Sequence, residues 1–480
     1  MKKTLIIPLD SRPCNTAWLK RLAAEAGVPA LIYPRSRCGT LHRGADFAGM
    51  MSMIEANIAD CEYLLISADG LASGGLIQAR LGLADPDRLS AELKVLGEYK
   101  KRYPGLKIYV FDTLMRTSIT AYDAESARHW SLVNEYSRLL GEEGAAESAR
   151  LRYLEKAIPE RVLNRYLRAR EIKLRLNLYF LEQTAAGVVD YLIILQEDTA
   201  PRGIQKREQE IIADFIKEHG LGNKVKTHNG TDEGGLLLLA KIVNEKRRHS
   251  PRVYLLLPEQ GVLEKTMLFE DRPFGENLRA MFETAGFVPA NDPDSADFIL
   301  AVYAEKENKD LDLSDFREVL PEKGPRYRAF VSELNNYLAA GKPAGLVDLL
   351  FPNGGSPELL GEIDYRALKV YSAWNTASNA LGSALCEIAV LTSVPDADHE
   401  AFKNERIMDD CVYQYIVRRQ VNRDLLASGH NIYDLGDLGP KVAARIAGEM
   451  EKYRFLVDNR RFRISLPWNR TFEIDIEVED

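Results

Sequence analysis

The sequence predicts an α/β protein with largely parallel sheets flanked by helices, and two observations carry that prediction. Short apolar runs recur along the chain, and each is long enough for one strand that is buried on both faces. The intervals between most of these runs are about 15 to 40 residues, which suits crossover helices. The runs lie at residues 5–9, 30–33, 63–67, 107–111, 191–195, 253–257 and 298–303.

The length of 480 residues predicts more than one domain, because a single hydrophobic core stops growing at roughly 250–300 residues. A polar stretch at residues 247–251 ends a predicted helix and places a boundary near residue 250. We therefore predict two Rossmann-like lobes. The first is an α/β domain over residues 1–250, and the second is an α/β domain over residues 251–397.

Two further segments are predicted to be mainly helical. Between about residues 123 and 186, apolar residues recur three and four positions apart in a charged stretch, which predicts a helical insertion in the first domain. Residues 398–480 are predicted to form a C-terminal appendage that is helical until its last part. There, residues 461–465 and 471–477 alternate in polarity and predict a β-hairpin.

Composition limits the partners and the location that we expect. The formal net charge of −8 argues against a general nucleic-acid surface. No apolar run reaches the roughly 18 residues that a membrane span needs, and no signal-peptide core is present. The five cysteines are scattered and contain no CxxC pair, which fits a reducing compartment. We expect a cytoplasmic protein without a nucleic-acid or membrane partner; its oligomeric state is unknown from the sequence.

The segment after the first predicted strand carries the first candidate site residues, Asp10 and Arg12. Ligands of open parallel sheets bind beyond the carboxyl ends of the strands, so polar residues that follow strands are candidates. Two interpretations remain open for this pair. The two side chains could bind one another, or they could present an acid and an anion clamp to a ligand.

A glycine-rich segment follows the third predicted strand, at residues 67–76. It contains Asp69, Gly74 and Gly75. A helix that begins near Gly74 would direct free N–H groups at an anion, whereas the glycines could equally serve only a tight turn. The segment matches neither a Walker loop nor a GxGxxG fingerprint.

The fourth and fifth predicted strands are also followed by charged residues. Arg116 follows the fourth strand and is a candidate clamp for a carboxylate or phosphate. The turn after the fifth strand brings Glu197, Asp198 and Arg202 into one short segment. One of two adjacent acids is often a solvated bystander, so either acid is a candidate.

A glycine-rich turn at residues 228–235 adds His228, Asn229, Asp232 and Glu233 before a strongly apolar helix. Asp232 or Thr231 could cap that helix, and Glu233 could interact favourably with its dipole. One capping role does not account for all of these polar groups. If the acids converge with those of the other turns, like charges could raise the pKa of one while another stays ionised.

In the second half of the chain the most unusual segment contains Trp374, Asn375 and Asn379. The two asparagines lie four apart and are predicted to share one face of a helix. A flat aromatic face next to amide groups suits a sugar. Buried asparagines that tie the backbone together are the alternative.

Eight segments of the chain together resemble the bacterial DUF4127 family. They are PLDSRP at 8–13, SADGLASGGLIQAR at 67–80, FDTLMR at 111–116, QEDTAPRG at 196–203, NGTDEGGLLLLA at 229–240, DRPFGENL at 271–278, AWNTASNALGSAL at 373–385 and LPWNRTFEID at 466–475. The resemblance spans nearly the whole chain and implies that these segments belong to one architecture. It implies no settled activity.

Three functional hypotheses follow. The leading one is a glycosidase-like hydrolase of a small polar or anionic sugar, in which one carboxylic acid protonates the leaving oxygen and another carboxylate acts as base or nucleophile. Arg12 and Arg116 would bind an anionic substituent. The candidate catalytic acids are Asp10, Glu197, Asp198, Asp232 and Glu233.

The second hypothesis is a metal-dependent hydrolase or lyase, because the same oxygens could hold Mg or Mn. No residue is predicted as a metal ligand, and no cofactor is required by the leading hypothesis. The third hypothesis is a non-catalytic sensor of a sugar or an anion. All three expect a small-molecule ligand.

Overall fold

The computed structural model describes residues 2–120, 124–141, 148–309 and 319–479. The chain divides into two compact units. The first comprises Met1–Leu238 and Phe269–Arg272, and the second comprises Leu239–Leu268 and Pro273–Asp480. The predicted α/β class with largely parallel sheets is confirmed. The domain boundaries near residues 250 and 397 stay predictions.

The first unit contains a six-stranded sheet in the order β2-β1-β3-β4-β5-β6. Every adjacent pair of strands is parallel, so all carboxyl ends lie at one edge of the sheet. Strands β1, β3, β4 and β5 are buried on both faces along most of their length, as their continuous apolar runs predict. Their bounds are β1 Lys3–Ile7, β2 Ala30–Ile32, β3 Cys61–Ser67, β4 Lys107–Leu114, β5 Tyr191–Gln196 and β6 Val225–Asn229.

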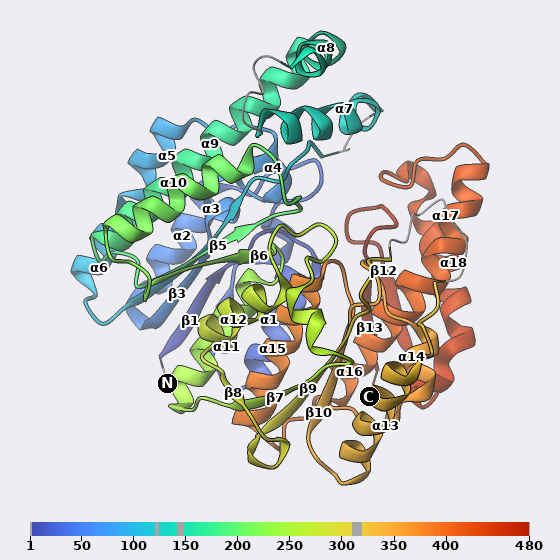
Figure 1. The fold of residues 1–480 in the computed structure, drawn as a ribbon. Coiled ribbons are helices and arrows are strands. Elements are labelled where there is room, and N and C mark those ends of the chain that lie inside the picture. Colours follow the sequence, from blue (N-terminus) through green and yellow to red (C-terminus); the bar gives the residue numbers. More distant parts are fainter. Residues whose placement is uncertain (1, 121–123, 142–147, 310–318, 480) are drawn as a thin grey trace. The chain divides into compact units, whose positions relative to one another are not determined.

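Helices cover both faces of this sheet (Figure 1). On one face, helices α2, α5, α6, α9 and α10 contribute to a core with alternate residues of β1, β3, β4 and β5. On the other face lie α1 and the start of α11. The helices are α1 Ala17–Glu25, α2 Phe47–Asn57, α3 Ala68–Ser73, α4 Leu76–Arg80, α5 Pro86–Leu93, α6 Val95–Arg102, α9 Glu160–Ala185, α10 Gln205–Glu218 and α11 Gly234–Arg247.

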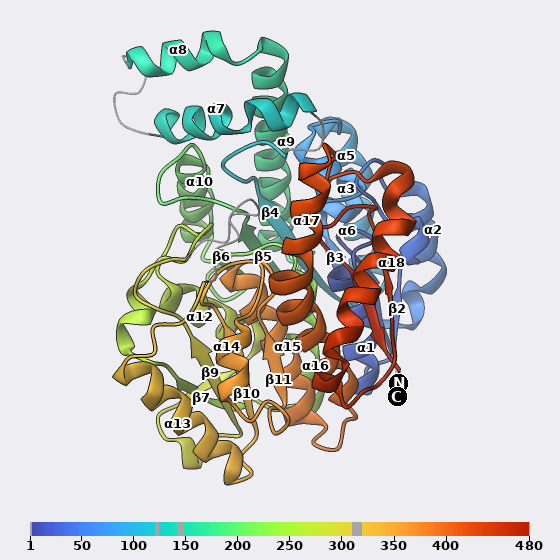
Figure 2. The same cartoon turned by 90° about the vertical axis from the view of Figure 1, so that its right-hand side faces the viewer.

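The predicted helical insertion contains α7 Ala124–Leu140 and α8 Ala149–Ala157 and continues into the long helix α9. Helices α7 and α8 lie side by side at one end of α9 (Figure 2). The three helices share a small apolar core that includes Val133, Leu154 and Tyr166. The same helix α9 packs further along against β4 and β5.

The second unit contains a five-stranded parallel sheet in the order β11-β10-β9-β7-β8. If the strands of each unit are counted from that unit's first strand, both sheets have the order 2-1-3-4-5, which a sixth strand extends in the first unit. This is a doubly wound order, in which the direction of strand addition changes once. The bounds are β7 Arg252–Leu256, β8 Val288–Ala290, β9 Phe298–Tyr303, β10 Ala344–Asp348 and β11 Val370–Ser372.

Helices α12 and α15 lie on one side of the second sheet, and α13 and α14 lie on the other (Figure 1). The C-terminal part adds a helical cluster around Met408, Ile446 and Met450, which includes a π-helix over Ile407–Val417. The predicted hairpin is present as β12 Phe462–Ser465 and β13 Asp475–Val478. The helices are α12 Phe274–Ala285, α13 Pro325–Ala339, α14 Pro357–Glu362, α15 Ala377–Ser393, α16 Glu400–Arg406, α17 Arg418–Ala427 and α18 Gly439–Met450.

Four strands of these sheets were not predicted from the sequence, namely β6, β8, β10 and β11. The sequence of β6 is Val-Lys-Thr-His-Asn, which contains no apolar run and therefore gives no strand signal. Its last residues, His228 and Asn229, were assigned to a turn. Strands β8 and β11 have three residues each, and β10 contains a glycine. Short strands give too few residues for a periodic signal.

Within the ranges that the structure describes, no helix has the length and apolar character needed to cross a membrane.

Helix α11 approaches the sheet of the first unit so closely that its first residue must be glycine. A Cβ on Gly234 would lie 2.5 Å from Phe111 Cδ2 and 2.7 Å from Leu195 Cδ1. We predict that Gly234→Ala lowers the free energy of unfolding by about 1–3 kcal/mol through overpacking. Gly448→Ala, on an exposed position of α18 with open space, should instead raise it by about 0.5–1 kcal/mol. Denaturant titration of both variants checks this, and a loss of stability in both would contradict it.

Candidate functional site

The carboxyl edge of the first sheet gathers most of the residues that the sequence singled out. Because all six strands are parallel, the segments that follow β1, β3, β4, β5 and β6 start from the same edge. Most of the acids in these segments are buried, whereas Arg116 and Asp198 are partly exposed. The candidates at this edge are Asp10, Arg12, Asp69, Arg116, Glu197, Asp198, Asp232 and Glu233.

Arg12 is held between two aspartates. Its Nε and Nη2 donate to Asp10, with Nη2 2.7 Å from Oδ2. Its Nη1 donates to Asp232 Oδ2 over 2.9 Å, and Nη2 also donates to Asp232 Oδ1. Asn15 Nδ2 donates to Asp10 Oδ1 over 3.1 Å. Of the two interpretations of Asp10 and Arg12, the structure shows the one in which they bind each other.

This cluster joins two loops whose strands are far apart in the sheet. Asp10 and Arg12 follow β1, whereas Asp232 follows β6, and β3, β4 and β5 lie between these strands. The segment after β6 therefore returns along the carboxyl edge to reach the segment after β1. Asp232 binds Arg12, so helix capping does not account for its position.

The electrostatics of the cluster favour a charged arginine. Burial alone would lower the pKa of Arg12, but Asp10 and Asp232 together raise it well above its ordinary value. Burial raises the pKa of Asp232, and Arg12 opposes that shift. An arginine that remains charged in the interior is expected where two carboxylates surround it.

A second group of ion pairs involves the segments after β3, β4 and β5. Arg80, the last residue of α4, pairs through Nη2 with Glu197 Oε1. Arg116 Nη2 lies 2.5 Å from Asp198 Oδ2. Burial lowers the pKa of Arg80, and the charge of Arg116 adds to this effect. Arg80 also lowers the pKa of Asp232, which places the two groups of ion pairs within electrostatic range of one another.

A third group buries a lysine. Lys173, on α9, pairs with Asp69 Oδ1 and lies 2.8 Å from Asp112 Oδ1. Thr113 Oγ1 donates to Asp69 Oδ2 over 2.5 Å, and Asn177 Nδ2 donates to Asp112 Oδ2 over 2.6 Å. Burial raises the pKa of Asp69 although Lys173 opposes the shift, and the two aspartates raise the pKa of Lys173 against the effect of burial.

Glu233 differs from the other acids because no cation pairs with it among the described residues. Burial raises its pKa to about 8, although the backbone N–H groups of Thr231 and of Glu233 itself lower it. Gly230 packs directly against this carboxyl group, since a Cβ there would overlap Glu233 Oε1. At neutral pH Glu233 is therefore a carboxylic acid.

His228 lies beside this acid, with Nδ1 4.0 Å from Glu233 Oε1. Its Nδ1 also lies 2.7 Å from the carbonyl oxygen of Asn229. Burial lowers the pKa of His228 to about 4. His228 is therefore neutral at physiological pH, with Nδ1–H as the donor to that carbonyl.

Several buried polar atoms at this edge have no hydrogen-bond partner among the described residues. They are Asn15 Oδ1, Glu197 Oε2, His228 Nε2 and Glu233 Oε1. A buried polar atom that stays unpaired costs about 1–3 kcal/mol, so such atoms in one region call for an explanation. A polar ligand that supplies donors and acceptors would satisfy them.

Two further predicted residues, Asn229 and Arg202, lie near the ends of β6 and β5. Asn229 Nδ2 donates to Asp271 Oδ1 over 3.2 Å, and the other oxygen of Asp271 lies 3.1 Å from Lys206 Nζ. Asn229 thus ties the segment Phe269–Arg272 to the first sheet. Arg202 is exposed, in contrast to the neighbouring acid Glu197.

The glycines of the segment after β3 serve a tight turn. Gly74 has a φ of +82°, and a Cβ there would lie 2.8 Å from the backbone nitrogen of Ala45. Gly75 has a φ of +141°. The helix that follows, α4, begins at Leu76, close to Gly74 as expected, and has only five residues. Anion binding at its N-terminus stays a prediction.

Trp374, Asn375 and Asn379 lie in the second unit. The prediction that the two asparagines share a helical face is wrong, because α15 begins at Ala377 and Asn375 has a φ of +65°. Asn379 Nδ2 donates to Thr376 Oγ1 over 2.9 Å. Trp374 is buried and lies edge-on to Phe472, with ring centroids 6.5 Å apart. These contacts are with side chains of the same unit. The role of the three residues in binding a sugar stays a prediction.

Sequence reasoning did not select Asn15, Arg80, Asp112 and Lys173. Asn15, Arg80 and Asp112 stand in or beside the segments that follow β1, β3 and β4, so their place in the chain was a usable signal. Lys173 had no such signal, because it is one of many basic residues in a helix that reads as amphipathic.

The metal hypothesis does not fit the acids of this edge. In the part of the chain that the structure describes, no group of three or more histidine, cysteine, aspartate or glutamate side chains could hold a metal ion. Asp10, Asp69, Glu197 and Asp232 instead have arginine or lysine partners.

Comparison with known proteins confirms the family that the sequence motifs indicate. A family model described as "Protein of unknown function (DUF4127)" matches residues 4–477. No curated protein and no solved structure matches the chain.

We predict that Lys173→Met lowers the free energy of unfolding by about 3–5 kcal/mol, because it leaves Asp69 and Asp112 buried without their cation. Lys101→Met is the control, since Lys101 and its partner Glu98 are exposed, and it should change stability by less than about 0.5 kcal/mol. Denaturant titration measures both. Equal effects of the two substitutions would show that the buried lysine is not required by the two aspartates.

A second prediction concerns the protonation of Glu233. Its pKa is about 8 in the folded protein and ordinary when unfolded, so the stability it contributes is complete below about pH 4.3 and is lost as the pH rises to about 8. Glu233→Gln removes this loss. The stability difference, variant minus wild type, should therefore grow by about 1.4 kcal/mol per pH unit between pH 5 and 8. Urea titrations across this range measure it. A constant difference across this range would show that Glu233 is ionised when folded.

Proposed function

Because the chain belongs to the DUF4127 family, whose description states no activity, we propose a function from the chemistry of the first unit. We propose that this unit is a glycosidase-like hydrolase that acts on a small polar or anionic sugar. Glu233 is its general acid, and Glu197 is its base or nucleophile.

The observation that carries this proposal is the contrast between two buried acids at one edge of the sheet. Glu233 is a neutral carboxylic acid at pH 7, because burial raises its pKa to about 8 and no cation pairs with it within the described ranges. Glu197 is in an ion pair with Arg80. Each acid keeps one oxygen without a partner among the described residues. Glycoside hydrolysis requires this pairing of one protonated and one ionised carboxyl group.

In the proposed reaction Glu233 gives its proton to the glycosidic oxygen as the bond from that oxygen to the anomeric carbon breaks. The leaving alcohol departs with the proton. Glu197 either takes a proton from the attacking water and later returns it through solvent to Glu233, or attacks the anomeric carbon itself. In that second route water then breaks the bond between Glu197 and the sugar, and Glu233 takes the proton of that water. In both routes one water is consumed, and both carboxyl groups return to their starting states.

The arginines suggest how an anionic substituent is bound. Arg12 already contacts two aspartates, so it is better suited to fixing the loops than to holding a substrate. Arg116 has one carboxylate partner, Asp198, whose side chain is 33% exposed. A substrate carboxylate can replace Asp198 at Arg116, because Asp198 can turn towards solvent. Arg116 is therefore the proposed clamp.

Access to the two acids requires a loop movement, since Glu197 and Glu233 are each about 1% exposed. Enclosure of the acids also supports the proposal, because exclusion of water strengthens electrostatic interactions with the reacting atoms. Loop opening and closing around a buried site is common among enzymes that protect a reactive intermediate.

We also propose a cytoplasmic location. The five cysteines are all free and buried, which suits a reducing compartment.

The proposal is tested with chromogenic aryl glycosides and aryl glycuronides. We predict that Glu233→Gln and Glu197→Gln each lower kcat at least 100-fold, because each removes a group required in the transition state. The pH profile of the wild-type enzyme should lose activity above about pH 8, where Glu233 ionises. Glu208→Gln is the control, since Glu208 is a buried acid paired with Arg170 outside the proposed machinery.

Retention of activity in Glu233→Gln or Glu197→Gln would refute these roles, provided that the melting temperature shows a folded variant. A loss of the same size in folded Glu208→Gln would show that any buried ion pair has this effect. Ligand-induced stabilisation by a sugar, without product after long incubation, would favour the sensor hypothesis over the hydrolase.

A further inference from the structure

The second unit contains a pocket that plays no part in the proposed hydrolase. Its volume is about 450 Å³, within the range of small-molecule sites. It lies where β9, β10 and β11 begin, because Phe298 opens β9 and Pro343 and Lys369 immediately precede β10 and β11. The end of α15 and the segment before α16 complete it. This is the edge opposite to the carboxyl ends of that sheet.

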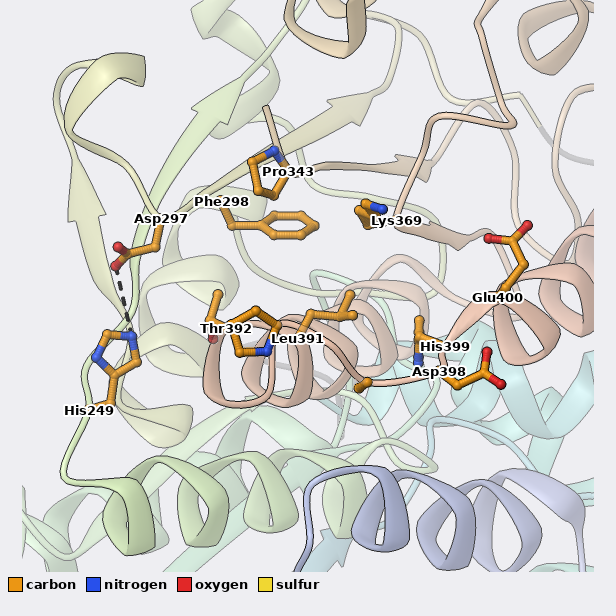
Figure 3. A pocket seen from close by; sticks show the side chains of 12 residues that line it. His249, Asp297, Phe298, Pro343, Lys369, Leu391, Thr392, Asp398, His399 and Glu400 are labelled. Carbon is orange, nitrogen blue, oxygen red and sulfur yellow. Dashed lines mark ion pairs between the residues drawn. The ribbon is translucent and has the colours of Figure 1, made fainter. Parts of the chain in front are cut away.

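The pocket has both polar and apolar walls, and its apolar residues lie on two sides of it. Figure 3 shows Phe298 and Pro343 on one side of the pocket and Leu391 and Thr392 on the other. The Thr392 hydroxyl donates to the Ile388 carbonyl oxygen over 2.7 Å, so it is occupied within its own helix. A ligand with an apolar body fits between these two walls.

Most charged groups of the pocket already have partners. Asp297 Oδ2 accepts from the Arg252 N–H over 2.7 Å and lies 3.9 Å from His249 Nε2. Glu400 Oε1 lies 2.8 Å from Lys403 Nζ. His399 is paired as well, since its Nε2 lies 2.8 Å from Glu387 Oε2.

Two lining residues remain with opposite charges. For the side chains of Lys369 and Asp398, the described part of the chain supplies neither a hydrogen bond nor an ion pair. Both lie away from the His249–Asp297 pair in Figure 3. A simple acid would neutralise only the lysine, and a simple amine only the aspartate. A zwitterion satisfies both.

We infer that this pocket binds a small zwitterion with an apolar side chain, such as an aliphatic α-amino acid or a short apolar peptide. The carboxylate pairs with Lys369, the ammonium group pairs with Asp398, and the apolar body packs between Phe298 and Leu391. The site is independent of the proposed hydrolase, because the two share no residue.

Isothermal titration calorimetry of the full chain tests this inference with four probes. L-leucine and L-leucyl-L-leucine carry both charges, 4-methylpentanoate lacks the ammonium group, and 3-methylbutan-1-amine lacks the carboxylate. We predict that at least one of the two zwitterions binds and that loss of either charge weakens binding at least tenfold. Tighter binding of the dipeptide than of leucine would identify peptides as the source of the ligand.

Two substitutions assign the charges to their partners. Lys369→Met should remove the preference for leucine over the amine, and Asp398→Asn should remove the preference for leucine over the acid. Both residues are exposed, so both variants should fold. Lys441→Met and Asp437→Asn are the matched controls on exposed positions elsewhere in the second unit and should leave binding unchanged. The inference is overturned if neither zwitterion binds at millimolar concentration, if binding does not depend on the two charges, or if the control substitutions weaken it equally.

Discussion

The contact of Arg12 with Asp10 and Asp232 is the interaction on which the carboxyl edge of the first unit depends. It joins the loop after the strand β1 to the loop after β6, although three strands of the sheet separate them. Removing the arginine would leave two buried carboxylates without a cation, which is far more costly than losing a surface ion pair. The position of Glu233 follows from this contact, because Glu233 is the neighbour of Asp232 in the chain. The neutral acid is thus placed by an ion pair in which it takes no part.

The same edge shows how a protein can keep many charges inside and still leave one group uncharged. Each of the cations Arg12, Arg80, Arg116 and Lys173 pairs with one or two carboxylates. Burial raises the pKa of Asp69, Asp232 and Glu233, and a cation opposes this shift at Asp69 and at Asp232. Among the described residues Glu233 has backbone N–H donors instead of a cation, and these donors do not offset the effect of burial on its pKa. An arginine or lysine partner stabilises a buried carboxylate more than backbone N–H groups do. The kind of partner therefore decides that Glu233 keeps its proton at neutral pH.

The fold class and most long strands could be predicted because their apolar runs are a local property of the sequence. The edge that holds Asp10 and Glu197 could be predicted as well, since parallel strands place their following segments together. Asp232 could not be placed there in this way, because it follows β6, which the sequence did not predict. Their partners could not be predicted, because Arg12 reaches Asp232 across 220 positions of the chain and Lys173 reaches Asp69 across 104. Asn375 was placed on a helix because its spacing from Asn379 suits one, but its left-handed backbone ends that pattern two residues before the helix begins. Local patterns therefore predict most helices and strands. The site depends on pairs of residues that are far apart in the sequence, and these pairs could not be predicted.

Helix α9 gives the insertion a mechanical connection to the acids. One part of this helix shares a core with α7 and α8, while Arg170 donates to the carbonyl oxygen of Arg116, Lys173 pairs with Asp69, and Asn177 donates to Asp112. A helix is stiff along its axis, and one residue of rise is about 1.5 Å. A shift of that size lengthens a 2.8 Å contact beyond the range of a hydrogen bond. A force on the insertion that moves α9 along its axis would therefore break the contacts of Lys173 and Asn177 with the acids. The insertion is thus mechanically coupled to the ion pairs of the carboxyl edge.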